Sequence, residues 1–361
     1  GTIMTLPYMA LFYVSWLVAS LYKPIIVVTL VVALAKPSAF LYKCTLFATT
    51  VQYLALCNDK KWTTPKEDPS PLFADAKEDE IESKTIVFVR HGESTWNDTF
   101  NKGDRSPIAF VLNFVPNLLK SLAYEWYFFL TGQSNESWFY DSPLSEKGKG
   151  QAEGVRDYLA ESLEYKTPKE KEFLKIMLGE TPSQLVSSNL RRAISTMAIG
   201  FQDRLSKQVK GDTMLIASDL QEISRNPDAN CITPARGKVL LSWTDPSYLE
   251  ETYAKQIDTK IHTGNKPVDT NGLKRLQAFS ELLFDETVIP KEKAVIVAGH
   301  SLWFRSFFRT YLPFTVEHVA KKKKIVNGGC VGFVLKRIKK ADGSYAYMVD
   351  PKTITVLFKG F

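Results

Sequence analysis

Cysteine and histidine are both scarce in this chain, with four of each among 361 residues. The cysteines, Cys44, Cys57, Cys231 and Cys330, form no close pairs and no metal-ligand spacing, so we expect free thiols in a reducing or neutral compartment. An excess of one charge sign is also slight, because 46 Lys and Arg residues against 39 Asp and Glu residues leave a formal net charge of +7. This diffuse excess argues against nucleic acid as a partner and suits anionic substrates or an anionic membrane surface.

The N-terminal region lacks charge almost entirely. Residues 3–22 contain no charged side chain and are long enough to span a hydrocarbon core of about 30 Å. Two further apolar stretches follow, separated by Lys23 and Lys36, and the second carries polar residues at helical spacing. A removed signal peptide fits poorly because the apolar character continues for more than 50 residues. We therefore predict a membrane anchor over residues 1–57, built from one or two hydrophobic transmembrane or interfacial helices.

The rest of the chain alternates short apolar runs with amphipathic stretches. The apolar runs predict strands at 85–89, 184–187, 213–217 and 294–298, and the amphipathic stretches predict helices at 145–163, 190–205, 270–284 and 301–311. Ser145 is the expected N-cap of the first helix, and 330–338 and 344–350 are predicted to form a hairpin. The lysine run at 321–324 is interpreted as a solvated charge run, with contact to anionic lipid as the alternative.

The organisation into domains follows from the same pass along the chain. A polar segment at 58–84 is predicted to be a linker, and residues 85–361 to form the catalytic domain. Strands that alternate with helices predict an α/β three-layer sandwich, with a mostly parallel central sheet and helices on both faces. An insertion at 107–140 is dense in aromatic residues, which suits a membrane interface or protein groove, or else a cap buried over the active site.

Two histidines directly follow strand-like apolar runs. The run at 86–89 ends in Arg90 and His91, and the run at 294–298 ends just before His300. Open α/β sheets place their ligands at the carboxyl ends of parallel strands, so we expect both imidazoles at such a site. The remaining histidines lack this context and are predicted on the surface: His262 and His318.

The residues around His91 resemble a known family. The run Arg-His-Gly-Glu-Ser-Thr-Trp-Asn at 90–97 is similar to the signature of the histidine phosphatase superfamily, in the form that phosphoglycerate-mutase-like members carry. Three more motifs agree with the family in type and order: Asp-Ser-Pro-Leu-Ser-Glu-Lys-Gly at 141–148, Ser-Asn-Leu-Arg-Arg-Ala at 188–193 and Ala-Gly-His-Ser at 298–301. The resemblance covers residues 84–337.

This resemblance implies phosphoryl transfer that needs neither a metal nor a cofactor. His91 would attack phosphorus and become phosphohistidine, which divides one difficult displacement into two easier ones. Arg90 and Arg192 would hold the phosphate oxygens through planar, bidentate donors, and His300 would donate a further hydrogen bond.

The resemblance also suggests which side chains handle the proton and the substrate. Glu222 stands where the family carries its general acid, with Asp219 as the alternative. Ser94 and Asn97, in the loop after His91, can hydrogen-bond the phosphate or its ester. The predicted site therefore comprises five catalytic and two substrate-binding residues: Arg90, His91, Arg192, Glu222 and His300, with Ser94 and Asn97.

The same motifs favour a phosphatase over a mutase. Family mutases carry Glu-Arg-His-Tyr-Gly at the acid, whereas Glu222 is followed here by Ile-Ser-Arg-Asn-Pro. Mutases also place a glycine after the second histidine, whereas Gly299 precedes His300. A phosphoglycerate mutase is therefore the less favoured activity, and we predict a membrane-anchored phosphatase that hydrolyses phosphomonoesters of small molecules or lipids.

A second prediction comes from another class of protein. The apolar N-terminus and the aromatic insertion are also compatible with an accessory structural subunit of a larger membrane complex, in which the phosphatase site is vestigial or secondary. Its partners would then be the lipid bilayer and other subunits of that complex. The basic, apolar N-terminal region suggests an organellar membrane, mitochondrial or plastid.

Overall fold

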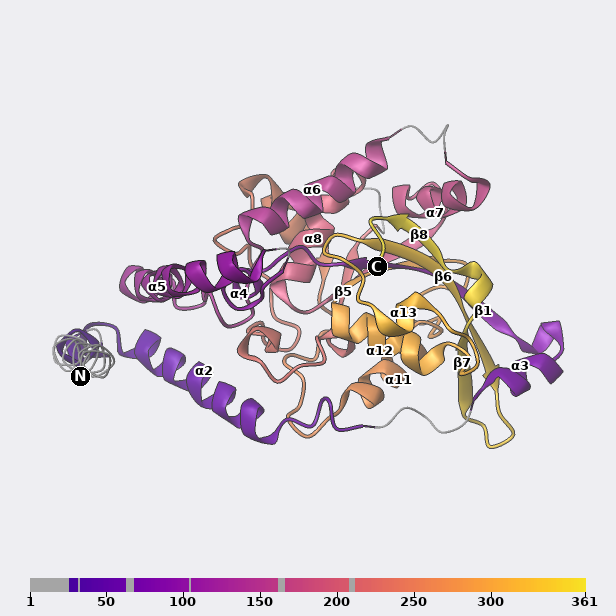
Figure 1. Cartoon of the computed structure of the whole chain (residues 1–361), viewed down its shortest axis with the longest axis horizontal. Helices are drawn as coiled ribbons and strands as arrows, with labels where there is room; N and C mark the ends of the chain where they lie inside the picture. Colours follow the sequence, from indigo (N-terminus) through magenta and orange to yellow (C-terminus); the bar gives the residue numbers. More distant parts are fainter. Residues whose placement is uncertain (1–25, 32, 63–67, 104, 162–165, 208–211) are drawn as a thin grey trace, which may run out of the picture.

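A mixed β-sheet forms the centre of the molecule (Figure 1). The computed structural model describes residues 26–31, 33–62, 68–103, 105–161, 166–207 and 212–361. Its eight strands follow the order β4-β3-β2-β5-β1-β6-β7, and β8 also pairs with β6. The strands are β1 (Glu82–Arg90), β2 (Ser183–Ser188), β3 (Met214–Ala217), β4 (Ile257–Asp258), β5 (Ala294–Gly299), β6 (Cys330–Lys339), β7 (Tyr345–Val349) and β8 (Thr355–Phe358).

The prediction of a mostly parallel sheet was wrong. The half containing β4, β3, β2, β5 and β1 is parallel, but β6 runs antiparallel to β1, β7 and β8. A short connection explains the pairing of β6 with β7: β6 passes directly into β7 through a turn that contains Gly343 with φ 84°. Only antiparallel strands can be joined by so short a turn. The sequence predicted this hairpin but not that it would extend the sheet beyond β1.

Helices cover both faces of the sheet, as predicted, because alternate residues of each strand point to opposite sides. Val87 and Val89 of β1 join one core with α6 (Glu146–Ala160), α7 (Pro168–Leu178) and α8 (Arg191–Gly200). Ile86 and Phe88 join the other core with α11 (Gly272–Leu282), α12 (Ser301–Tyr311) and α13 (Val319–Lys322). The shorter helices are α3 (Ser70–Asp75), α4 (Thr95–Phe100), α9 (Gln202–Leu205) and α10 (Glu250–Lys255).

The start of α6 fixes the loop that follows β1. Ser145 caps the helix as predicted, accepting a hydrogen bond from the backbone N–H of Gly148 at 3.1 Å. Gly148 and Gly92 then allow the two segments to touch. A Cβ added at Gly92 would lie 2.3 Å from the Gly148 carbonyl oxygen, and one at Gly148 would lie 1.9 Å from the carbonyl oxygen of Glu93. The glycines are therefore needed for close backbone approach beside His91.

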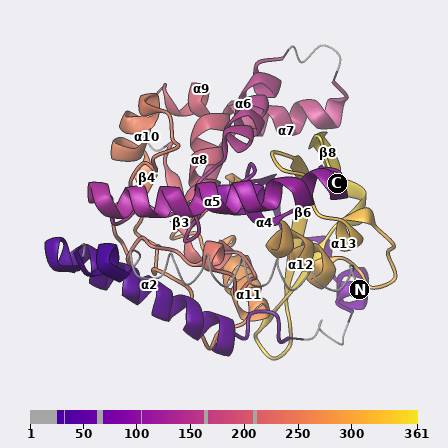
Figure 2. The ribbon, with the colours of Figure 1, turned by 60° about the vertical axis from the view of Figure 1, so that its left-hand side comes forward.

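Two long helices lie side by side away from the sheet (Figures 1 and 2). They are α2 (Pro37–Leu56) and α5 (Pro107–Thr131). Lys43 Nζ lies 3.1 Å from Glu125 Oε2, and the rings of Phe40 and Phe129 stand 6.4 Å apart. The predicted helix near residues 38–57 is thus present, and it packs against the aromatic insertion.

The predicted membrane anchor is described only in part, because the uncharged run at 3–22 lies outside the described residues. Within the described ranges, no single helix is both long and apolar enough to cross a bilayer. The stretches Ile26–Ala35 and Pro37–Leu56 reach that length and hydropathy only together, and they are bent by 119° at their junction.

The aromatic insertion divides its side chains between inside and outside. Phe128, Trp138 and Tyr140 are buried, and Tyr124 and Trp138 both stack against Trp243, at 4.9 and 5.7 Å between centroids. Aliphatic side chains of α5 are instead exposed: Ile108, Val111, Leu112, Val115, Leu119, Leu122 and Leu130. The aromatic residues therefore fasten α5 to the domain, and the aliphatic face remains uncovered.

The segment predicted to be a polar linker is joined to the domain at its start. Asp59 is buried and forms ion pairs with Lys266 and Arg275, the latter at 2.7 Å. Its backbone carbonyl accepts a hydrogen bond from Gly272 at 3.0 Å. The segment also contains the short helix α3, and β1 begins at Glu82, earlier than the predicted strand. The chain is therefore held to the catalytic domain on both sides of residues 63–67.

Candidate active site

Four adjacent parallel strands carry the candidate residues to one edge of the sheet. In the order β3-β2-β5-β1, these strands end at the same edge because they run in the same direction. His91 follows β1 and His300 follows β5, its parallel neighbour. Arg192 lies in the first turn of the helix after β2, and Glu222 follows β3. Residues more than 100 positions apart in sequence are thereby gathered at one site.

A cavity of about 170 Å³ opens at this edge. Among the predicted residues, it is lined by Arg90, His91, Asn97, Arg192 and Glu222. Ser94 and His300 are not among its lining residues. The other lining residues are Trp96, Asn101, Ser224, Asn226, Asp228, Ser301, Leu302 and Lys324.

His91 is held in one tautomer with its other nitrogen facing Arg192. Its Nδ1 lies 2.5 Å from the Gly92 carbonyl oxygen, which can only accept, so this nitrogen carries the proton. Arg192 Nε donates to His91 Nε2 at 3.3 Å. Burial, and then the positive charges of Arg192 and Arg90, hold the pKa of His91 well below its usual value. The imidazole is therefore neutral at physiological pH, and its unprotonated Nε2 accepts the hydrogen bond from Arg192.

Two buried guanidinium groups make the site cationic. Arg192 donates to the Asp228 carbonyl at 2.6 Å, and its Nη2 lies 3.5 Å from the Asp228 carboxylate. Arg90 donates to the Ile325 carbonyl at 2.6 Å, while its buried Nε has no partner among the described residues. Burial lowers the pKa of Arg90 to about 10, which leaves the group charged at neutral pH. A bound anion would supply the acceptors that these donors lack.

Glu222 is oriented by the start of α12. Its Oε1 accepts hydrogen bonds from the backbone N–H groups of Ile223 at 2.9 Å and Trp303 at 3.1 Å, and its Oε2 from Leu302 at 3.4 Å. These donors fix the carboxyl group where it lines the same cavity as His91. The alternative acid, Asp219, is not among the lining residues.

His300 and Ser94 lie behind the cavity wall. His300 is fully buried, its ring centroid is 5.0 Å from that of His91, and its Nε2 lies 2.8 Å from Ser188 Oγ. The Nδ1 of His300 has no partner among the described residues. Ser94 Oγ accepts from the Asn97 backbone N–H at 3.2 Å and so caps α4. The roles predicted for these two residues in holding phosphate stay predictions.

Sequence reasoning missed several residues of the cavity. Asp228 lines it beside Arg192, and burial raises the pKa of this carboxyl to about 6 despite the neighbouring guanidinium. Lys324 also lines it, although the run at 321–324 suggested a solvated charge run. Neither residue stands in a motif, so no sequence signal could have assigned it. Among the described ranges, no three His, Cys, Asp or Glu side chains are grouped closely enough to hold a metal ion.

The surface prediction for His262 was wrong. This side chain is 1% exposed, with Nδ1 2.9 Å from Ser218 Oγ and Nε2 3.2 Å from the Thr233 carbonyl oxygen. It stabilises the loop between β4 and α11 by satisfying buried polar groups. His318 is partly exposed and caps α13, as the sequence allows.

No family model and no curated protein matches this chain. Solved structures with a related arrangement include a mycobacterial glucosyl-3-phosphoglycerate phosphatase, at 14% identity, with 74% of this chain and 97% of that one covered, and a TM-score of 0.33. A putative α-ribazole-5'-phosphate phosphatase from Escherichia coli is 12% identical, with 77% of this chain and 98% of that one covered and a TM-score of 0.34. A phosphoglycerate mutase from Bacillus anthracis is 14% identical, with 76% of this chain and 95% of that one covered and a TM-score of 0.35. With TM-scores this low, we infer activity from the site alone.

Proposed function

We propose that this protein is a phosphatase that hydrolyses phosphomonoesters through a phosphohistidine on His91. The observation that carries the proposal is the neutral His91 Nε2, which lies beside two buried guanidinium groups in a cavity that also holds the Glu222 carboxyl. A nucleophile, a cradle for an anion and an acid–base group are thus within one small volume. The motif resemblance to histidine phosphatases supports the same assignment.

The reaction follows from this placement in two displacements. His91 Nε2 attacks phosphorus, the P–O ester bond breaks, and protonated Glu222 gives its proton to the leaving alcohol oxygen. Water then attacks phosphorus, the P–N bond breaks, and Glu222 takes the proton from that water. Arg90 and Arg192 balance the charge on the phosphoryl oxygens in both steps. Inorganic phosphate leaves and His91 is neutral again.

Phosphate attached to the protein tests this mechanism directly. Wild type and His91→Ala are incubated briefly with a ³²P-labelled phosphomonoester and quenched. We expect label that is stable in base and labile in acid on the wild type only, and turnover that falls by roughly 10⁴-fold or more in the variant. Label that persists in His91→Ala would remove His91 as nucleophile, and unchanged circular dichroism would show that the variant is folded.

We also propose that the N-terminal part holds the protein at a membrane. The uncharged run at 3–22 and the exposed aliphatic faces of α2 and α5 support this. On α2, the exposed large apolar residues are Leu41, Phe47, Val51, Leu54 and Leu56. Apolar surface shared between neighbouring helices is typical of a membrane or protein contact. The substrate would then be a small phosphorylated molecule or a lipid phosphate reached from that surface.

The same apolar faces support the second candidate, an accessory subunit of a larger organellar membrane complex. Extraction of the native membrane in mild detergent, followed by sizing of the particle, separates the two. A particle of the size of one chain plus detergent would support the anchored phosphatase. A much larger particle without phosphohistidine formation would support the subunit.

A further inference from the structure

A second, larger cavity opens beside the site of His91. Its volume is about 520 Å³, and it shares Arg90, Asn97, Asn101 and Lys324 with the smaller cavity. Because four residues line both, the two spaces are neighbours along one wall. The smaller cavity has about the volume for one phosphoryl group and its surroundings, so the larger one is available to the rest of the substrate.

The lining of the larger cavity is cationic. Arg90, Lys324 and Lys359 contribute three positive charges, and Glu93 is the one carboxylate among the lining residues. Glu93 is already engaged, with Lys147 Nζ 3.7 Å away and the Ser145 hydroxyl donating to it at 3.2 Å. Within the described ranges, neither Lys324 nor Lys359 has an ion pair. Positive charge therefore predominates in this space, although the charge of Glu222 partly offsets that of Arg90 and Lys324.

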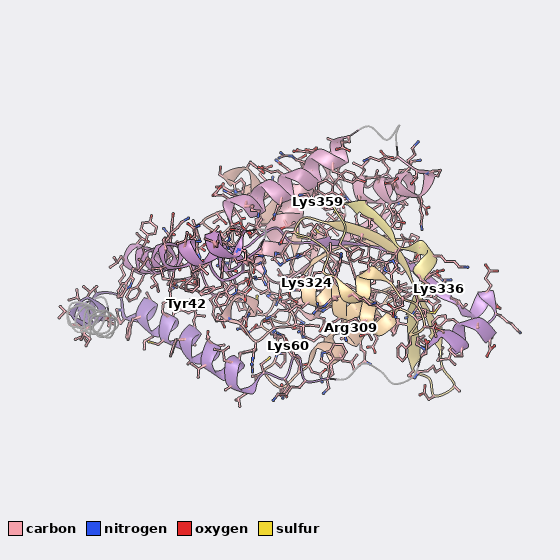
Figure 3. The ribbon with its side chains drawn as sticks, in the orientation of Figure 1. Tyr42, Lys60, Arg309, Lys324, Lys336 and Lys359 are labelled. Carbon is pink, nitrogen blue, oxygen red and sulfur yellow. The ribbon has the colours of Figure 1, made fainter. Side chains whose placement is uncertain are left out.

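Like charges crowd around Lys324, which lies near the centre of the view in Figure 3, with Lys359 above it. Burial, and then the positive charge of Arg90, lower the pKa of Lys324, while Glu222 opposes them and Arg305 and Lys60 add to them. An anion bound in the cavity would relieve this repulsion.

Backbone hydrogen bonds fix the segments that carry both lysines, which are themselves exposed residues. Lys324 precedes Ile325, whose carbonyl accepts the Arg90 guanidinium at 2.6 Å. Lys359 adopts the left-handed conformation, with φ 57°, next to Gly360, whose carbonyl accepts from the Val326 N–H at 2.8 Å. A side chain at positive φ carries a conformational cost, and such costs gather at functional sites. The two cations thus come from paired loops rather than from free chain ends.

We infer that the substrate carries a second phosphate, which Lys324 and Lys359 bind in the larger cavity while the scissile phosphate lies against His91. This inference rests on the proposed function for the identity of the reacting group. Neutral polar side chains, Asn97, Asn101 and Gln151, complete the lining and can hydrogen-bond the connecting part of the substrate. The second phosphate binds and positions the substrate without reacting.

The test compares ligands that differ only in the second phosphate. Propyl phosphate and the bisphosphates of ethanediol, propanediol and butanediol serve as substrates, and the matching phosphonates serve as unreactive ligands for calorimetry. We expect at least one bisphosphate to exceed propyl phosphate about tenfold or more in kcat/KM, and its phosphonate to bind correspondingly more tightly. In Lys359→Gln this preference should fall about tenfold, with a smaller loss on propyl phosphate. Lys322→Gln, at an exposed lysine that ends α13 and lines neither cavity, is the control.

The outcomes separate this inference from the proposed function. Equal binding of mono- and bisphosphonates, or a preference that survives in Lys359→Gln, would overturn the second-phosphate site while leaving the phosphatase intact. Tighter bisphosphonate binding without phosphohistidine formation would support the site and remove the hydrolytic activity. A preference for a phosphate-plus-carboxylate ligand over every bisphosphate would also overturn it. Lipid vesicles with one bisphosphorylated headgroup, compared with the soluble bisphosphates, show whether the second phosphate belongs to a lipid.

Discussion

The cavity at the sheet edge and the pair of helices α2 and α5 depart from ordinary packing in opposite directions. At the sheet edge, charged groups such as Arg192 are buried, with 1% of that residue exposed. On α5, large aliphatic side chains are exposed, with Ile108 at 73% and Leu112 at 71%. Buried charge needs a partner of opposite charge, and a wide exposed apolar face is typical of a binding surface. In the cavity Asp228 supplies a partner for Arg192 from within the chain, whereas the exposed face of α5 is typical of a surface that binds apolar matter from outside the chain.

The two regions also differ in how they are supported. The cavity residues are held by many backbone groups, as the three N–H donors to Glu222 show. Helices α2 and α5 contact each other through isolated side-chain pairs, such as Lys43 and Glu125. Chemistry needs fixed positions, whereas contact with lipid or a broad protein surface tolerates movement.

Within the cavity, substitution of the acid should give the largest effect after that of His91→Ala. Glu222→Gln keeps the shape but cannot exchange a proton, so kcat for a phosphomonoester should fall by roughly 10²–10⁴-fold. Steady-state kinetics with an ester of a poor leaving group measure this loss. Asp219→Asn, at the alternative acid, should change kcat little, and the reverse result would move the acid role to Asp219.

Loss of the buried ion pairs that join the N-terminal segment to the loops beside the cavity should have the next largest effect, which is on stability. Asp59→Ala leaves Lys266 and Arg275 buried without their carboxylate, and the free energy of unfolding should fall by about 3–5 kcal/mol. Urea unfolding measures it. Glu317→Gln removes the fully exposed ion pair with Lys322 and should leave the free energy of unfolding nearly unchanged. If Asp59→Ala lowered the free energy of unfolding as little as Glu317→Gln does, Asp59 would not be what joins this segment to the domain.

Acid should weaken the fold through the buried histidines. Burial holds the pKa of His91 and His300 well below usual, so below about pH 6.5 the unfolded chain binds protons that the folded chain does not. The free energy of unfolding should therefore decrease as the pH is lowered below this value. The slope should approach about 1.4 kcal/mol per pH unit for each histidine. Urea unfolding between pH 7.5 and 5 should show a flatter slope in the double variant His91→Gln/His300→Gln. His318→Gln should flatten the slope much less, because burial lowers the pKa of this partly exposed imidazole but not as far below its usual value as those of His91 and His300. Identical slopes in all three proteins would contradict the assignment.

The exposed helix face should show the smallest effect on stability. Val111→Gln/Val115→Gln should change the free energy of unfolding by no more than about 0.5 kcal/mol per site. Binding to neutral phosphatidylcholine vesicles should nevertheless weaken about tenfold per residue, because each valine then loses its transfer from water. Val356→Gln, an exposed valine on β8 that is 46% exposed, should leave vesicle binding unchanged. Unchanged binding in the α5 variant would remove this face from the membrane proposal.

The sequence predicted the parallel half of the sheet well because local signals mark it. Apolar runs produced β1, β2, β3 and β5, and Ser145 marked the start of α6. The strand β4, with two residues, is too short to show a periodic pattern. The position of β6 beside β1 depends on strand pairing between distant segments, which a local pattern does not contain.

The candidate site divides in the same way. Arg90, His91, Arg192 and Glu222 were found because each follows a strand or stands in a motif, and parallel strands end at one edge. The sequence alone thus indicated that these four side chains meet. Only the tertiary structure decided that Asp228 and Lys324 line the cavity, that Ser94 caps a helix, and that Asp59 is buried beneath the Glu222 loop. These placements depend on how loops pack on one another, and packing between residues far apart in sequence leaves no periodic or motif signal.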